Sequence, residues 1–266
     1  MFTEPFMQRA LLAALFLGPL CAFMGVFVTA RRMAFFSDTI SHAALTGVAL
    51  GFWFGLVDPT WPMVGVSLLV ALGIMWLREN TDLLTDTIMA LLLSASVAVG
   101  VIILSLLKGF RGELHSYLFG EILTIGPQEV WMAAALFAVV GVILFWQLTP
   151  MTLLTAQEEI AQVCGVPVRR FNYISVIVLT FAVALTIRLV GIILTPALIV
   201  IPPAAARAVS RNLRQQIIFS IIFGLIGSVG GTLLSYQLDV QSGPTIVLTC
   251  VALFIATLFL GRLRHT

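Results

Sequence analysis

Residues 7–30 read MQRALLAALFLGPLCAFMGVFVTA, and this apolar run decides the fold class. A bilayer core about 30 Å thick is crossed by roughly 20 apolar residues of helix. Inside lipid the backbone must satisfy its own hydrogen bonds, so only helices and closed barrels can cross. Barrel strands alternate apolar and polar residues, whereas this run is apolar on every side. It therefore predicts a first membrane-spanning helix rather than a removed signal peptide, whose small-residue cleavage site is missing.

The rest of the chain repeats this composition. Of its 266 residues, 60% are hydrophobic and only 10% are charged, against roughly 25% charged residues in a soluble domain. Such a surface must face lipid. We predict an all-α, polytopic integral membrane protein that forms a single transmembrane domain over residues 1–266, with about nine spans and with eight or ten still possible. The predicted spans are 7–30, 34–56, 61–77, 87–107, 129–148, 173–191, 193–209, 214–236 and 243–261.

Two segments depart from this simple pattern. The span at 193–209 carries Pro196, Pro202 and Pro203, and each proline removes a backbone donor, so a broken or kinked helix is expected there. Segment 113–126 is too short and too polar for a span. An interfacial or re-entrant helix is expected in its place.

The basic residues predict the orientation. With nine spans and the N-terminus outside, only Arg9, Lys108 and Arg111 fall outside, and Arg188 lies within a span. Cytoplasmic loops of membrane proteins carry an excess of Lys and Arg, so this orientation is favoured. The arginines it places in the cytoplasm are Arg31, Arg32, Arg78, Arg169, Arg170, Arg207, Arg211, Arg214, Arg262 and Arg264.

The longest cytoplasmic loop is then 149–172, and it is expected to hold one short helix near 155–166. Thr155 can cap this helix, and Glu158 and Glu159 in its early turns favour the positive end of the helix dipole. Gly165 and the proline that follows end it. The chain has no Walker motif, so any ATP-driven work needs a separate chain to hydrolyse ATP.

The candidate functional residues lie in FSDTISHAALTGVALGFWFG, residues 36–55. Asp38 and His42 are four residues apart, which places them on one face of a helix. Ionisable residues inside membrane helices are costly and usually mark an ion or substrate path. Imidazole nitrogen with carboxylate oxygen suits zinc, and also manganese or iron. The alternative is a helix-capping aspartate and a structural histidine; Ser37 and Ser41 could assist a metal site weakly.

Other residues carry weaker signals. Gly47, Gly51 and Gly55 form a doubled GxxxG pattern, which is typical of close helix packing. Glu121, near His115, could join an ion path or simply face water. The three cysteines are far apart and predict no disulfide framework. HExxH and GxSxG motifs are missing, which argues against a membrane enzyme, and no basic stripe predicts nucleic-acid binding.

Four blocks resemble the zinc/manganese ABC importer permease family, and the resemblance runs over about residues 7–261. The first block, RRMAFFSDTISHAALTGVALG at 31–51, resembles the family's arginine turn and Asp-x-x-x-His helix. The later blocks are SYLFGEILTI at 116–125, LVGIILTPALIVIPPAAAR at 189–207 and GPTIVL at 243–248. Within the family the chain looks most similar to zinc-uptake permeases.

The resemblance implies a bacterial cytoplasmic-membrane permease that works as a homodimer with two ATP-binding subunits below and a metal-delivering binding protein outside. It implies that Asp38 and His42 contact the metal in its path and that 155–166 is the coupling helix docked on the ATPase. Zinc would be the transported ion rather than a permanently bound cofactor. Manganese or iron(II) remains open as the cargo. Rival interpretations are a permease for a siderophore or cobalamin and a stand-alone secondary cation transporter, which would carry inverted repeats.

Overall fold

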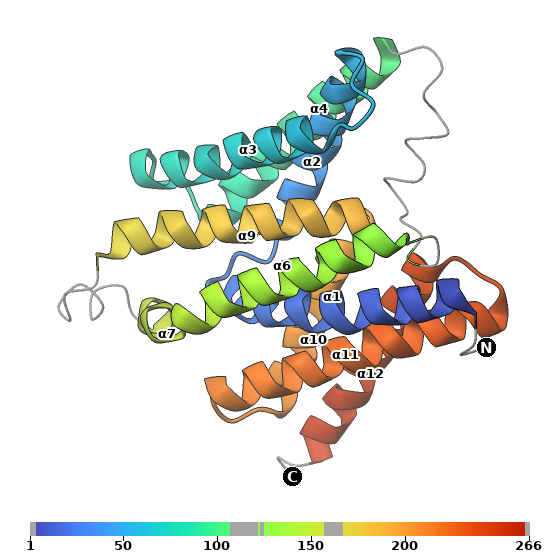
Figure 1. Ribbon diagram of the computed structural model, residues 1–266. Coiled ribbons are helices and arrows are strands. Elements are labelled where there is room, and N and C mark those ends of the chain that lie inside the picture. The colour runs from blue at the N-terminus through green and yellow to red at the C-terminus, as the bar shows by residue number, and fades with distance from the viewer. Residues whose placement is uncertain (1–3, 107–121, 123–124, 157–166, 264–266) are drawn as a thin grey trace. The chain divides into compact units, whose positions relative to one another are not determined.

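The computed structural model describes residues 4–106, 122, 125–156 and 167–263, and these residues contain helices and turns but no strand (Figure 1). The predicted all-α class is therefore confirmed. The helices are α1 (Pro5–Ala30), α2 (Phe36–Trp53), α3 (Thr60–Asn80), α4 (Thr85–Leu106), α6 (Pro127–Trp146), α7 (Leu148–Ala156), α9 (Val168–Val190), α10 (Leu194–Val209), α11 (Leu213–Leu238) and α12 (Ser242–Leu263).

Seven of the described helices are long and apolar enough to cross a membrane: α1, α3, α4, α6, α9, α11 and α12. The other two predicted spans coincide with α2 and α10. Helix α2 is less apolar because it carries Asp38 and His42, and α10 has only 16 residues. Each predicted span thus has a helix at its position, while most of segment 113–126 lies outside the described residues.

The chain divides into two compact units, and each is described by itself. The first unit comprises residues 1–29, 115–139 and 186–266. The second comprises residues 30–114 and 140–185. Helices α1, α10, α11 and α12 build the first unit, and α2, α3, α4 and most of α9 build the second.

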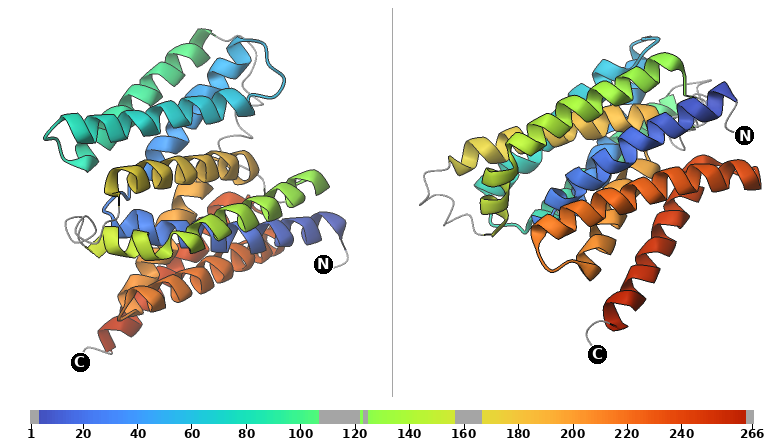
Figure 2. Two further views of the ribbon diagram at one scale, coloured as in Figure 1. Left: turned by 60° about the vertical axis from the view of Figure 1, so that its left-hand side comes forward. Right: turned by 60° about the horizontal axis from the view of Figure 1, so that its bottom comes forward.

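In the first unit, α11 runs alongside α1, as both views in Figure 2 show. The hydroxyls of Ser220 and Ser228 donate hydrogen bonds to the α1 carbonyls of Ala22, at 2.8 Å, and Ala14, at 3.0 Å. A Cβ on Gly18 would lie 2.7 Å from the Gly224 carbonyl oxygen. Small residues and interhelical hydroxyl bonds therefore hold this pair together, which is how helices associate where lipid removes the hydrophobic driving force.

The prolines of α10 do not break it. Helix α10 continues from Leu194 to Val209 with Pro202 and Pro203 inside, so a break at these prolines is excluded, while the alternative expectation of a kink stays a prediction. Pro203 has no N–H for the carbonyl of Ile199, four residues earlier. Gly25 of α1 lies against this same oxygen, and a Cβ at that position would clash with it. Neighbouring helices commonly accommodate the backbone groups that a membrane proline leaves unbonded.

In the second unit, α2 is fixed against both of its neighbours. The hydroxyl of Thr46 donates to the Ser96 carbonyl of α4 at 2.6 Å, and that of Thr39 contacts the Met89 carbonyl at 3.3 Å. Toward α3, a Cβ on Gly47 would lie 2.6 Å from the Met63 Cα. These contacts fix how α2 is rotated about its axis, and rotation decides which side chains it leaves accessible.

The three glycines of the GxxxG pattern have two different roles. Gly47 and Gly51 lie against α3, where Gly51 approaches Pro59. Gly55 lies beyond the end of α2, has φ +73°, and has no neighbour where a Cβ would lie. The packing role predicted for Gly55 is therefore wrong. Glycine adopts this left-handed conformation at no steric cost, and it commonly follows the end of a helix.

Most of the predicted cytoplasmic helix near 155–166 lies outside the described residues, so it stays a prediction. Helix α7 runs from Leu148 to Ala156, just before it, and Thr155 lies near the end of α7. Pro150 lies in the first turn of α7, where a proline is tolerated. Glu158, Glu159 and Gly165, the predicted coupling residues, lie outside the described residues.

The close approach of α2 and α3 gives a test of the fold. Gly47→Ala should lower the thermal stability of the detergent-solubilised protein, because its new methyl group would meet the α3 backbone; overpacking costs about 1–3 kcal/mol. The control is Gly65→Ala in α3, where nothing lies within 4 Å of the added Cβ. Equal melting temperatures for the two variants would contradict this packing.

Candidate metal site

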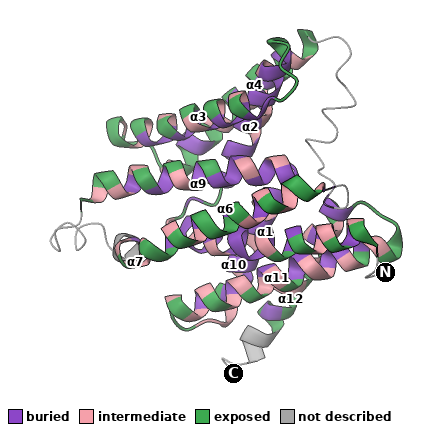
Figure 3. Ribbon diagram, in the orientation of Figure 1, coloured by how far each residue is buried: buried purple, intermediate pink, exposed green. Residues whose placement is uncertain are grey.

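The accessible part of α2 is a narrow stripe. Most of α2 is buried, as the burial colours of Figure 3 show. Asp38, His42 and Leu45 are partly exposed, while the residues between them are buried. Their spacing of four and then three residues places all three on one face of the helix. The faces toward α3 and α4 are occupied by the contacts described above, so the stripe is the part of α2 left for another molecule to reach.

Asp38 and His42 form a loose pair within this stripe. His42 Nε2 lies 3.8 Å from Asp38 Oδ1, and the side chains are 32% and 44% exposed, respectively. Asp38 lies in the first turn of α2, where a negative charge is stabilised by the helix dipole. This placement lowers the free-energy cost of a charged carboxylate on an apolar helix. The side chains of Asp38 and His42 both stay accessible.

The pair can offer a metal ion one nitrogen and one oxygen ligand. Two ligands on a tetrahedral zinc, each at about 2.0–2.1 Å, lie about 3.3–3.4 Å apart, so small rotations about the side-chain bonds would bring the observed atoms to that spacing. Among the described residues no group of three or more His, Cys, Asp and Glu side chains is placed to hold a metal. A two-ligand site binds weakly, as a site that must release its ion requires.

The neighbouring serines do not complete the site. Ser41 is buried, and its hydroxyl donates to the Ser37 carbonyl at 2.7 Å. The Ser37 hydroxyl is also buried and has no hydrogen-bond partner in the described part of the chain. Both serines lie off the accessible stripe, so the assisting role considered for them from the sequence is wrong. Glu121 and His115 lie outside the described residues.

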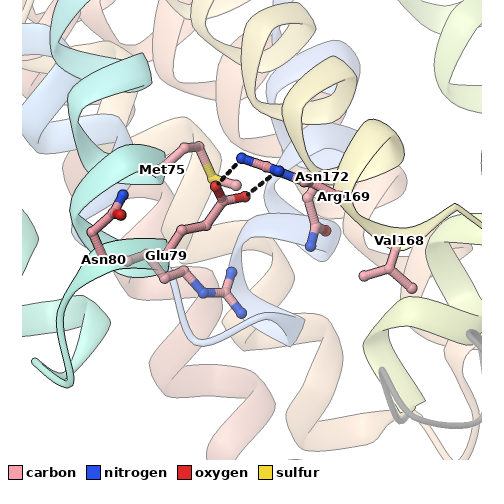
Figure 4. Close-up of a pocket in the computed structure, with 7 residues that line it drawn as sticks. Met75, Glu79, Asn80, Val168, Arg169 and Asn172 are labelled. Carbon is pink, nitrogen blue, oxygen red and sulfur yellow. Dashed lines mark hydrogen bonds and ion pairs between the residues drawn. The ribbon is translucent and has the colours of Figure 1, made fainter.

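A second polar cluster, which was not predicted from the sequence, lies where α3 ends and α9 begins. Arg169 donates from Nε and Nη2 to the two carboxylate oxygens of Glu79, at 3.2 and 2.8 Å (Figure 4). The Tyr173 hydroxyl donates to the same carboxylate at 3.1 Å. A cavity of about 520 Å³ adjoins this pair. Arginine in the first turn of a helix opposes the helix dipole, and that is the sequence signal that could have found the cluster.

Comparison with known proteins places the whole chain in one family. The model of the ABC 3 transport family matches residues 3–261. The high-affinity zinc uptake system membrane protein ZnuB of Haemophilus influenzae is 34% identical over 252 residues, which cover 94% of this chain and 95% of that protein. The manganese transport system membrane protein MntC of Halalkalibacterium halodurans is 30% identical, covering 96% of this chain and 87% of that protein.

A solved structure supports the same assignment. PsaBC from Streptococcus pneumoniae in complex with Fab matches with a TM-score of 0.83 and 29% sequence identity, and the match covers 96% of this chain and 91% of that chain. The similarity therefore includes the helix arrangement as well as the sequence, and it extends over nearly the full length of both chains.

The geometry of α2 predicts how the site responds to mutation. His42→Ala should weaken zinc binding by the isolated protein by about tenfold or more, since even residues that only support a metal ligand are worth 10–100-fold. Ser41→Ala should leave the affinity unchanged, because its hydroxyl bonds to the helix backbone. Calorimetric titration with zinc measures both. Equal loss in the two variants would show that the binding site lies elsewhere on α2 or that α2 is distorted.

Proposed function

This chain belongs to the ABC 3 transport family, and on that premise we propose that it is the membrane permease of an ATP-driven zinc importer. As a family member with this helical architecture, it is a multi-pass transport component rather than an enzyme. The cargo, its path and the partners are what we propose, and the accessible Asp38–His42 pair on the largely buried helix α2 supports them.

The pair suits the transient binding of a divalent cation. The neutral imidazole of His42 and the carboxylate of Asp38 give an ion two ligands 3.8 Å apart, and the remaining ligands come from water or from a second copy of the chain. Two copies related by a two-fold axis would offer the same stripe twice, for two nitrogens and two oxygens in all. Two nitrogen and two oxygen ligands suit zinc, and withdrawal of the two ligands of one copy would release the ion.

The partners follow from what the chain lacks. It has no nucleotide-binding motif, so separate ATP-hydrolysing subunits would supply the energy from the cytoplasmic side. Helix α7 and the residues up to 167, which the charge distribution places in the cytoplasm, are the proposed docking segment. A binding protein on the outer side would deliver the metal. The proposed location is the bacterial cytoplasmic membrane, and the ion is cargo rather than a resident cofactor.

Zinc is proposed over manganese on ligand chemistry. Imidazole suits zinc, whereas manganese favours carboxylate, carbonyl and water oxygens. The Haemophilus influenzae relative is a zinc uptake protein, and the Halalkalibacterium halodurans relative is a manganese transport protein. Manganese is therefore the second candidate cargo, and competition between the two ions is the discriminating measurement.

The proposed transport activity is tested by uptake of labelled zinc into proteoliposomes that hold this chain with its ATPase and binding protein. Uptake should require ATP, and Asp38→Ala or His42→Ala should reduce it by about tenfold or more. Acid should also reduce it, because a ligating imidazole must be deprotonated. An excess of unlabelled zinc should compete more strongly than the same excess of manganese.

The control is Asp82→Ala, which removes an exposed carboxylate from the turn between α3 and α4. It should leave uptake unchanged. Full uptake in the His42→Ala variant would exclude the proposed ion path. Stronger competition by manganese than by zinc would identify manganese as the cargo, and the proposed ion path would still stand.

A further inference from the structure

The cavity between the end of α3 and the start of α9 has the features of an anion site. It encloses about 520 Å³, and Arg78 and Arg169 both line it, with Glu79 as the only acidic side chain among the lining residues. The positive-inside count places this end of both helices at the cytoplasmic surface. A concave site with a net positive charge at that depth faces the headgroups of the inner leaflet.

Arg169 is oriented and still has unused donors. Glu79 accepts from its Nε and Nη2 atoms, and the Tyr173 hydroxyl holds the carboxylate in place. A guanidinium has five N–H donors in a rigid planar fork. The contacts to Glu79 use one edge of the fork, and the side chain as a whole is 77% exposed. The other edge can therefore bind an oxyanion in the bidentate geometry that arginine favours.

Asn172 gives an independent indication of a ligand. It lines the cavity one turn after Arg169, is only 8% exposed, and makes no hydrogen bond with another described residue. Buried amide groups in proteins are almost always hydrogen-bonded. A side-chain amide that is mostly buried, lines the cavity and has no partner among the described residues is suited to donate to a bound oxygen.

The start of α9 adds to the positive potential. Arg169 and Arg170 occupy its first turn, which contains no acidic residue. Basic residues there oppose the helix dipole, so they do not serve the stability of the helix. They do reinforce the attraction of a helix N-terminus for an anion.

An apolar stripe leads from the cavity along α3. Met75 and Val168 contribute apolar surface to the cavity itself. Large exposed apolar side chains then follow on α3 at helical spacing, namely Leu69, Leu72 and Trp76. Trp76 is nearest the cavity in sequence, and tryptophan prefers the membrane interface. A ligand with a charged head and long apolar tails would match this succession of surfaces.

We propose that the cavity binds the phosphate group of an anionic phospholipid from the cytoplasmic leaflet. Arg169 and Asn172 donate to the phosphate oxygens, Arg78 contributes positive charge, and the acyl chains lie along α3. Basic pockets between membrane helices on this side are a recognised type of lipid site. The apolar stripe of α3 favours a lipid over a free phosphate or an acidic protein surface. The inference does not depend on which ion the chain transports.

The test is a titration of the detergent-solubilised full chain with dioctanoyl-phosphatidylglycerol, followed by thermal shift and equilibrium binding. Dioctanoyl-phosphatidylcholine and inorganic phosphate are the comparison ligands. Wild-type protein should bind the phosphatidylglycerol at least about tenfold more tightly than either comparison ligand. Asn172→Asp, which changes one atom and brings negative charge into the cavity, should weaken that binding at least about tenfold, a loss of the size set by one charged hydrogen bond.

Arg211→Gln is the control, because Arg211 is exposed in the turn between α10 and α11 and does not line the cavity. It should retain wild-type binding. The double variant Glu79→Gln/Arg169→Gln removes the ion pair without leaving an unpaired charge, and it should lose phosphatidylglycerol binding while still folding. Equal affinity for phosphatidylcholine or for inorganic phosphate would overturn the lipid assignment. So would unchanged phosphatidylglycerol binding in Asn172→Asp.

Discussion

Every backbone polar group inside lipid must find a partner within the protein, and the rest of this structure depends on that constraint. It makes the chain helical, and it also decides how the helices meet. Hydroxyls of Ser220, Ser228 and Thr46 donate to carbonyls of a neighbouring helix. Gly25 lies against the Ile199 carbonyl that Pro203 leaves without an N–H. The hydroxyl side chains thus donate hydrogen bonds to backbone carbonyls, and glycine allows a carbonyl of a neighbouring helix to approach closely.

The same constraint explains how a polar pair can lie on α2. The helix is fixed by Gly47 against α3 and by Thr46 against α4, so its rotation is determined by contacts that involve neither Asp38 nor His42. The ionisable side chains then fall on the one stripe that remains accessible. The first-turn position of Asp38 reduces the cost of its charge. Packing of α2 against α3 and α4 therefore leaves a third face of the helix accessible.

Charged residues at the membrane surface follow a different logic. The Arg169–Glu79 pair is partly exposed to solvent, and exposed ion pairs contribute little to stability. Its clearest consequence is geometric, because it holds one edge of a guanidinium in place and leaves the other edge facing outward. Together with the buried Asn172, this pair gives the end of α3 and the start of α9 charged and polar groups, which the apolar central parts of these helices lack. The two sites thus lie on different elements and suit ligands of opposite charge.

The sequence by itself determined the all-α class, the position of each predicted span and the Asp38–His42 face, because apolar length and helical spacing are local properties of the chain. It assigned Gly55 to packing, and this assignment failed because the position where a helix ends depends on its neighbours. Only the tertiary structure brought Arg169 to Glu79, across 90 residues. It also separated the buried Ser41 from the accessible His42. Contacts between distant segments are set by how helices pack, which no local pattern records.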